Sequence, residues 1–199
     1  MLRTTAVILA ACIAAAAVGA CVVYMMAGGG PGEEAGNEYL GMQAKYNVSD
    51  GMALITVVSG TVEIKVVDEK KELGRTYIRI ECVYDIKAGA DRYKDTVTTD
   101  FFEVGGGGTL TSALSGAVST KAIGTERNMR VNVNGESYRV DTTKYSAEVM
   151  EQSAVIWVGD KDDMVYKAEA TLSGTWLPQE FISLFGIKLI FTLDSTNII

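Results

Sequence analysis

The chain has 199 residues, with 18 lysines and arginines against 25 aspartates and glutamates, for a formal net charge of −7. It contains no histidine, which excludes Ser-His-Asp and Cys-His catalysis and histidine-ligated zinc. The acidic balance, with a pI near 4.7, argues against a surface that neutralises phosphates. Any catalysis would rest on carboxylates or lysines, and nucleic acid is not an expected partner.

The N-terminal region is a long apolar stretch followed by a glycine-rich, acidic one. Residues 4–27 carry no charge, and as a helix they would measure about 36 Å, enough to span a bilayer. Arg3 precedes the stretch, so the positive end is expected to stay inside. The sequence predicts a membrane anchor over 1–27, a flexible linker over 28–38 and a domain outside the cytoplasm over 39–199.

The same stretch is compatible with two other signals. Val18-Gly19-Ala20 before Cys21 loosely fits the small-residue pattern of a lipidated cysteine, and a cleaved signal peptide also begins with a short basic start. The apolar run continues through 22–26 instead of turning polar, which favours an uncleaved, single-pass anchor in the cell membrane. Lipidation at Cys21 and ordinary cleavage stay open.

Apolar and polar residues alternate through most of the remaining chain, as they do in strands with one wet face. The sets predicted to share the buried face are Leu40, Met42, Ala44, Tyr46 and Val48; Val62, Ile64 and Val66; Ile78, Ile80, Cys82, Tyr84 and Ile86; Met164, Tyr166, Ala168, Ala170 and Leu172; and Ile187, Leu189, Phe191 and Leu193. Such strands are typical of antiparallel sheets. About nine strands are expected, and Cys82 is expected to be a buried small apolar group.

Turn signals separate these strands. They lie at Ser59-Gly60, at 87–91, at Asn134-Gly135 and at 160–163. Asn134-Gly135 is the most specific, because a two-residue type I′ turn needs positive φ at both central positions. The register that follows pairs Val133 with Glu136, Val131 with Tyr138, Met129 with Val140, and Asn128 with Asp141, with Val131, Tyr138, Met129 and Val140 on the core side.

On the wet face of this hairpin the register places Arg130 opposite Arg139. Like charges in direct opposition are unfavourable unless an anion or a carboxylate lies nearby. The pair is therefore a candidate contact for an anionic ligand. The alternative is two solvated arginines, with Asp141 diagonal to Arg130.

Two segments depart from the strand pattern. Residues 105–118 begin with four glycines and lack the Gly-Lys-Ser/Thr of a phosphate loop, so we expect a connection or lid with weak helical spacing. Residues 175–186 carry apolar groups nearly all round a predicted short helix, with Glu180 as the only charge, inserted between two strands. The candidate ligand-contacting residues of this insertion are Trp176, Phe181, Ile182, Leu184 and Phe185. They either plug the core or form a hydrophobic lip that contacts a lipid or the membrane and lines or covers an apolar ligand site.

No constellation for catalysis or metal binding emerges. Residues 160–163 lack the spacing of an EF-hand loop, and 68–72 read as a mixed-charge turn. No pair of acids has a defined separation, so the chain is not expected to be an enzyme, and no cofactor or metal is expected. Asn47 begins a three-residue glycosylation sequon, which is a weak signal.

Residues 122–174 carry a resemblance to a known family. The segments concerned are Gly124-Thr125-Glu126, the hairpin 134–140, the Trp157-containing strand 155–163, the Lys-x-Glu strand 165–169 and Ser173-Gly174. In outline their order resembles the bacterial lipoprotein-carrier superfamily of LolA- and LppX-like proteins. The resemblance implies an incomplete antiparallel barrel wrapped around short helices, with acyl chains held on its concave apolar face. The first half departs from that pattern, since 33–39 offers no long opening helix.

The overall expectation is a mainly β protein: an antiparallel half-barrel of about nine strands with one or two short helices, preceded by one transmembrane helix. Its expected function is to bind lipid or another apolar ligand without catalysis while tethered to the membrane. The alternative is a structural or adhesive cell-surface module with a filled core and no ligand. The alanine-rich anchor and acidic body also resemble uncharacterised archaeal surface proteins in composition.

Overall fold

The computed structural model describes residues 39–50, 58–88, 91–98, 100–103, 119–149, 152–162, 164–172 and 187–197. In these ranges no helix is long and apolar enough to cross a membrane. The predicted anchor and linker, the connection 105–118 and the insertion 175–186 lie outside them. So do the short helices expected there and the candidate residues Trp176, Phe181, Ile182, Leu184 and Phe185.

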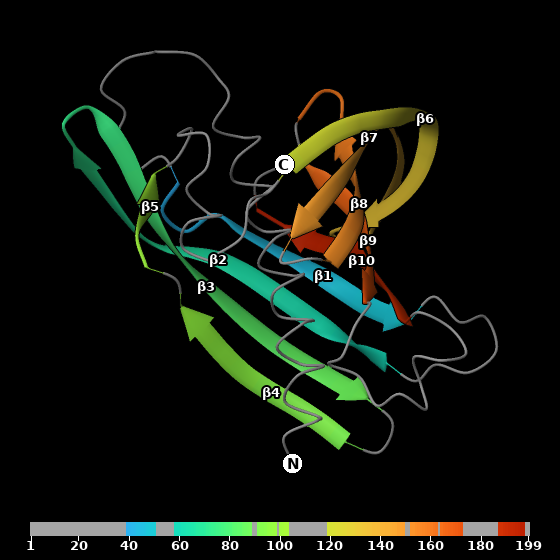
Figure 1. The fold of residues 1–199 in the computed structure, drawn as a ribbon, viewed down its shortest axis with the longest axis horizontal. Coiled ribbons are helices and arrows are strands. Elements are labelled where there is room, and N and C mark those ends of the chain that lie inside the picture. The colour runs from blue at the N-terminus through green and yellow to red at the C-terminus, as the bar shows by residue number, and fades with distance from the viewer. Residues whose placement is uncertain are drawn as a thin grey trace.

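The described part of the chain is an antiparallel β-sheet (Figure 1). Its strands are β1 (Gln43–Asp50), β2 (Val58–Glu72), β3 (Arg75–Ala88), β4 (Asp91–Thr98), β5 (Phe102–Glu103), β6 (Ser119–Val133), β7 (Glu136–Val149), β8 (Gln152–Gly159), β9 (Val165–Leu172) and β10 (Ile187–Thr196). Nine of them follow the order β4-β3-β2-β1-β10-β9-β8-β7-β6, and the two-residue β5 pairs with β3. The predicted antiparallel sheet of about nine strands is confirmed.

The sheet has two regions that meet at its centre. Strands β1–β5, here called the wing, run outward from the middle as a broad and gently twisted surface (Figure 1). Strands β6–β10, here called the curled half, return from the opposite edge and bend over (Figure 1). The first and last strands, β1 and β10, pair with each other and join the regions. Because β4 and β6 occupy the two ends of the strand order, the sheet is open.

The curled half is closed at one end by the β6–β7 hairpin. The backbone N–H of Asn134 donates to the carbonyl of Asp194 at 2.8 Å. The Asn134 side chain accepts from the Thr196 N–H at 3.0 Å and donates to the Thr196 carbonyl at 2.9 Å. The hairpin tip is thus fixed on the end of β10.

The predicted buried face is largely correct. Alternate residues along β1, β2, β3, β9 and β10 form one apolar core. Tyr46 is 1% exposed, and Val62 and Phe191 are 0% exposed. Cys82 is buried as predicted, and burial raises the pKa of its thiol to about 11. Leu40 is an exception: it precedes β1 and is 45% exposed, because the alternation begins only with the strand itself.

The Asn134-Gly135 turn has the predicted geometry. Asn134 and Gly135 have φ of 55° and 82°, as a type I′ turn requires. The structure pairs Val133 with Glu136, Val131 with Tyr138, and Met129 with Val140 as predicted. The expected pairing of Asn128 with Asp141 is wrong, because a β-bulge at 127–128 interrupts the register between Glu126 and Met129.

Two other expected turns lie inside a strand. Ser59-Gly60 belongs to β2, where Gly60 allows close approach to β3: a Cβ at this position would lie 2.2 Å from the Asp85 carbonyl oxygen. Residues 68–72 also belong to β2, and the turn is formed by the next two residues, Leu73 and Gly74. The prediction failed because the charged residues 68–72 have the composition of a loop although they lie in a long hairpin.

Candidate functional site

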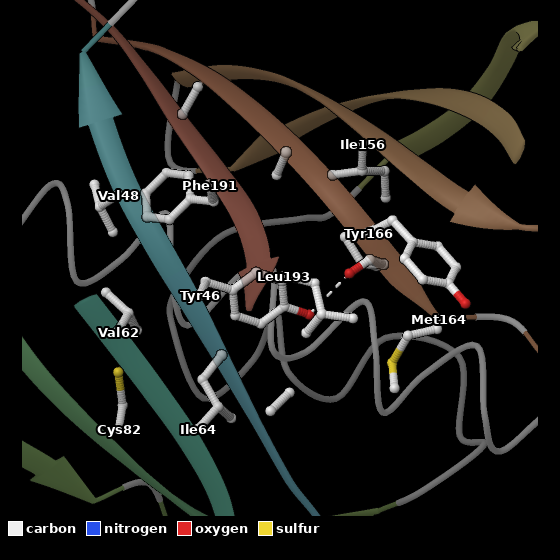
Figure 2. Packing of buried hydrophobic residues seen from close by; sticks show 14 of the residues in the cluster. Tyr46, Val48, Val62, Ile64, Cys82, Ile156, Met164, Tyr166, Phe191 and Leu193 are labelled. Carbon is white, nitrogen blue, oxygen red and sulfur yellow. Dashed lines mark hydrogen bonds between the residues drawn. The ribbon is translucent and has the colours of Figure 1, made fainter. Parts of the chain in front are cut away.

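The candidate ligand site is the apolar inner face of the sheet, whose centre is Tyr46 on β1 (Figure 2). The Tyr46 hydroxyl donates to the carbonyl of Val165 on β9 at 3.1 Å, which spans the junction between the wing and the curled half. Side chains from several strands continue the face on both sides: Val48, Val62, Ile64, Cys82, Ile156, Met164, Phe191 and Leu193. The alternation of the strands therefore builds one continuous apolar surface.

The buried tyrosines on this face have internal partners. The Tyr166 hydroxyl donates to the Asp162 carboxylate at 2.6 Å, and its ring meets Tyr138 edge-on with 6.4 Å between centroids. Burial, followed by the adjacent Asp162, raises the pKa of Tyr166 well above its usual value. The face therefore offers a ligand apolar contact more than hydrogen bonds, which suits hydrocarbon better than a polar molecule.

The inner face is covered in this structure. The core side chains are between 0% and 8% exposed, so nearly all of their surface is in contact with other atoms of the chain. A carrier with an open, empty groove would leave the lining partly accessible. Any ligand of this face must therefore replace contacts that the chain itself now makes.

The arginine pair predicted as an anion contact does not lie on the inner face of the sheet. Arg130 and Arg139 pair across β6 and β7 as predicted, and both are exposed. They alternate with the inward-facing Val131 and Tyr138, so they occupy the outer face of the hairpin. The structure does not bring them to the inner face, and Arg139 donates to the carbonyl of Asn128 at 3.4 Å.

Asp141, expected to lie diagonal to Arg130, has other partners. It accepts from the backbone N–H of Asn128 at 2.8 Å and from Arg127 at 3.3 Å. The first of these hydrogen bonds, together with the charge of Arg127, lowers the pKa of Asp141. The bulge turns Arg127 toward Asp141 and Asp160, which pairing by simple alternation could not predict.

A cluster around Trp157 on the outer face of the curled half was not predicted. Trp157 is 6% exposed, and its indole N–H donates to Glu126 at 3.0 Å. Lys144 bonds the same carboxylate at 2.9 Å. The ammonium groups of Lys144 and Lys167 lie 5.2 and 4.6 Å from the indole centroid. The two hydrogen bonds, from Lys144 first and Trp157 second, lower the pKa of Glu126.

The cluster continues along β9 and β10. Lys167 pairs with Glu169 at 2.7 Å, and Lys188 pairs with the same carboxylate. Burial opposes ionisation of Glu169, but the hydrogen bonds from both lysines together lower its pKa. One indication of this cluster is present in the sequence: Trp157 occupies a position that the alternating pattern assigns to the solvent-facing side of the strand. The three lysines and two glutamates of this cluster are linked by ion pairs across β6, β7, β9 and β10.

In the part of the chain that the structure describes, no three acidic or cysteine side chains are grouped to hold a metal ion. Two acids of the predicted 160–163 turn, Asp160 and Asp162, have specific partners. Asp160 accepts from Thr143 at 2.7 Å and from Arg127 at 3.0 Å, and Asp162 accepts from Met164 N–H at 3.0 Å. Both carboxylates therefore hold the β8–β9 turn.

No protein-family model matches the chain, and no curated protein matches it. Among solved structures, it is similar to a "putative lipoprotein" from Parabacteroides distasonis, with 7% identity, TM-score 0.37, and coverage of 79% of this chain and 95% of that one. It is also similar to a DUF1329 family protein from Desulfovibrio piger, with 10% identity, TM-score 0.28, and coverage of 90% and 91%. A LolA superfamily protein from Nitrosomonas europaea has 8% identity, TM-score 0.27, and coverage of 89% and 92%.

These structures include a member of the superfamily that residues 122–174 resemble in sequence. The TM-scores, all below 0.5, are too low to carry an argument about ligand or mechanism.

Proposed function

We propose that this chain is a membrane-tethered β domain outside the cytoplasm that binds lipid or another apolar ligand on the inner face of its sheet, without catalysis. The observation that carries the proposal is the single apolar face running without interruption from β3 through the β1–β10 junction to β8. We infer that the curvature of this face lets it contact an elongated apolar molecule on more than one side. Its buried hydroxyls of Tyr46 and Tyr166 already have partners, so hydrocarbon can lie against it without leaving polar groups unpaired.

The proposed cover of this face is the apolar insertion 175–186. Leu172 at the end of β9 and Ile187 at the start of β10 are paired directly, so the 14 residues between them leave and rejoin the sheet at one point. We infer that Trp176, Phe181, Ile182, Leu184 and Phe185 contact the ligand there. Because cover and ligand are both apolar, exchanging one for the other conserves buried apolar area and has a small net free-energy cost.

The proposed anion contact, Arg130 with Arg139, is a separate and weaker element. Its position on the outer face of the hairpin means that it does not meet an acyl chain held inside. We retain it as a candidate contact for an anionic group approaching from outside. Neutralising both arginines to glutamine is expected to leave acyl-chain binding unchanged.

The test is photo-cross-linking in cells that express the full chain and are fed a diazirine-bearing fatty acid. Ligand binding predicts adducts on peptides that carry inner-face residues such as Phe191 and Tyr46, and none on the β4 peptide, whose described side chains are exposed. The double variant Phe181→Ala/Phe185→Ala is expected to lose the inner-face adducts while its urea midpoint stays near that of the parent. Absence of inner-face adducts in the parent chain would refute the proposal.

The second candidate function is a structural or adhesive surface module. Exposures of 0–8% over the inner face favour it, because a module with a filled core needs no ligand to bury these residues. In that case Phe181 and Phe185 plug the core, and each truncation is expected to cost about 3–5 kcal/mol. The same double variant would then unfold, and the parent chain would yield no lipid adducts.

The tethering is tested separately. If residues 4–27 span the bilayer, replacing Ala14 and Ala15 by aspartate is expected to cost about 2.5–3.5 kcal/mol for each charge and to release the chain from membranes. Resistance of the parent chain to carbonate extraction is the control. If the mature protein is found to begin at Cys21 or later, the spanning anchor is wrong, and residues 1–20 or more belong to a lipoprotein signal or a cleaved signal peptide.

A further inference from the structure

The tip of the β2–β3 hairpin carries an apolar side chain in an unfavourable setting. Leu73 is 102% exposed, so it buries nothing against the domain. Its φ is 52°, in the left-handed region that leucine rarely adopts, and Asn or Gly would form this two-residue turn more easily. Folding of the domain therefore gives no reason for a leucine at this position.

The residues around Leu73 are charged and aromatic. Positions 68–75 hold three cations, Lys70, Lys71 and Arg75, and three acids, Asp68, Glu69 and Glu72. Glu72 pairs with Lys70 at 2.9 Å, and Lys71 and Arg75 flank the apex. Just behind the tip, Lys70 lies 4.7 Å and Arg79 lies 4.4 Å from the centroid of the Phe101 ring. An apolar apex with flanking cations and aromatic rings is the composition of a site that contacts an anionic membrane surface.

The chain enters the domain beside this hairpin. The backbone N–H groups of Tyr39 and Leu40 donate to the Glu69 carboxylate at 2.7 and 3.0 Å, and Gly41 donates to the Val66 carbonyl at 2.9 Å. Glu69 lies four residues before Leu73, so the tip reaches roughly 13 Å beyond the point of entry. In Figure 1 the hairpin projects past the start of β1, away from the curled half.

The distance to the membrane is limited by the linker. Eleven residues, 28–38, separate the predicted anchor from Tyr39, and a chain of that length spans at most about 40 Å. The end of the domain at which the chain enters is therefore the end held near the bilayer. Leu73 projects from that end, while Lys87, near the far end of β3, lies about 45 Å away along the strand.

We propose that the β2–β3 hairpin tip docks on the anionic surface of the membrane that holds the anchor. Leu73 enters the interfacial region, and Lys71 and Arg75 meet lipid phosphates. The contact gives the domain a second attachment and sets its orientation, with the far end of β3 directed away from the bilayer. This inference rests on the tethering part of the proposed function and not on ligand binding by the inner face.

The test places a fluorophore beside Leu73 in the full chain. The variant Glu72→Cys, labelled with the environment-sensitive dye NBD in a Cys12→Ala/Cys21→Ala background, is reconstituted into phosphatidylcholine vesicles with or without phosphatidylglycerol. Cys82 is 4% exposed and its thiol pKa is raised to about 11, so it does not compete for the label. The matched control carries the dye at the exposed position 87, as Lys87→Cys.

With phosphatidylglycerol present, the dye at position 72 is expected to shift to the blue and to be quenched by lipid bearing a nitroxide, and the dye at position 87 is not. Adding Leu73→Asn is expected to reduce the ratio of membrane-docked to undocked hairpin tip about tenfold. The variant is expected to be as stable as the parent chain or more stable. Lys71→Gln and Arg75→Gln are each expected to reduce that ratio about fivefold. A merely structural leucine would show the opposite pattern, with lower stability and unchanged quenching.

Several results would overturn the proposal. Equal quenching at positions 72 and 87 would mean that the whole domain lies on the bilayer, and equal quenching without phosphatidylglycerol would exclude recognition of an anionic surface. A blue shift without quenching by nitroxide lipid would place Leu73 in a protein contact. If the chain does not float with vesicles, the tether and this inference both fail, whereas inner-face binding is still judged by the cross-linking experiment.

Discussion

The wing and the curled half share one inner face but are stabilised differently on their outer faces. In the curled half, Trp157 lies between two lysines and hydrogen-bonds to Glu126, and Glu169 links two more strands through its lysine partners. In the wing, the interactions include Arg92 with Asp85 at 2.7 Å, Lys70 with Glu72 at 2.9 Å, and the cations of Lys70 and Arg79 over the Phe101 ring. Identical alternation along the strands is therefore combined with different side-chain interactions on the outer faces of the two regions.

Their free edges are protected by different means. Along β4, the wing's edge, the described side chains are exposed and include Arg92, Lys94 and Asp95. Along β6, the edge of the curled half, register shifts interrupt the ladder after Ala122 and after Glu126. Charges in the first case and bulges in the second hinder pairing with another strand. We expect the Trp157 cluster to contribute to the stability of the curled half.

The largest expected effect comes from breaking the junction between the two regions. Phe191 on β10 is 0% exposed and pairs with Val48 on one side and Ala168 on the other. Phe191→Ala is expected to lower the free energy of unfolding by about 3–5 kcal/mol, because it removes contacts on both sides and leaves a cavity. Urea denaturation followed by circular dichroism measures this change.

The matched control is Val97→Ala on β4, at a position 47% exposed, with an expected change within about 0.5 kcal/mol. A single transition shifted to lower urea would show that wing and curled half unfold together. If Phe191→Ala instead produced two separated transitions, the regions would be independently stable and the description of one continuous core would be wrong.

The next effect compares the two tight hairpins. In the curled half, Gly135→Val forces a β-branched residue to φ of 82° and is expected to destabilise the chain by at least about 1 kcal/mol. In the wing, Leu73→Asn replaces an unfavourable residue at φ of 52° and is expected to stabilise it by about 0.5–1 kcal/mol. Shifts of the same sign in the urea midpoint would contradict the turn assignments.

The sequence predicted most of the sheet because alternation is a local property. The inner-face positions of β2 and β3 follow from it directly, and Asn134-Gly135 set the register of the β6–β7 hairpin through its turn type. The failures have physical reasons. The charged residues 68–72 resemble a loop until their partners across the sheet are known. The bulge at 127–128 is accompanied by a hydrogen bond from the Asn128 N–H to the Asp141 carboxylate, which exists only in the folded hairpin.

Less of the candidate site was predictable. Alternation places Tyr46 and Tyr166 on the inner face, but their hydrogen bonds to Val165 and Asp162 depend on the curvature of the sheet. The Trp157 cluster needs residues of β6, β7 and β9 in register, and no local pattern encodes that register. The insertion 175–186 lies outside the described residues, so its place over the inner face stays a prediction.

A smaller effect tests the outer face of the curled half. Trp157→Phe retains most of the ring and removes the indole N–H that Glu126 accepts, so a loss of about 1 kcal/mol is expected. Glu126→Gln keeps an acceptor for Trp157 but removes the charge that Lys144 bonds. If neither variant lowers the thermal midpoint, the Trp157 cluster does not contribute to the stability assigned to this half.

The smallest effect is a difference in acid sensitivity. The pKa values of Glu126 and Glu169 are both lowered from an ordinary value of 4.5, so the folded chain binds their protons less readily than the unfolded chain does. Their contribution to stability is therefore fully present above about pH 4.5 and is lost as the pH falls through the lower values of the folded state. Denaturation midpoints measured from pH 7 downward are expected to decline over this window, and the double variant Glu126→Gln/Glu169→Gln is expected to start lower and to decline less steeply. Asp85 in the wing also has a lowered pKa, through its hydrogen bond from Arg92, but the side chain of Arg92 is 71% exposed, so Asp85→Asn is expected to change the slope least. A larger effect of Asp85→Asn would mean that the outer face of the wing, and not that of the curled half, holds the charges that matter for stability.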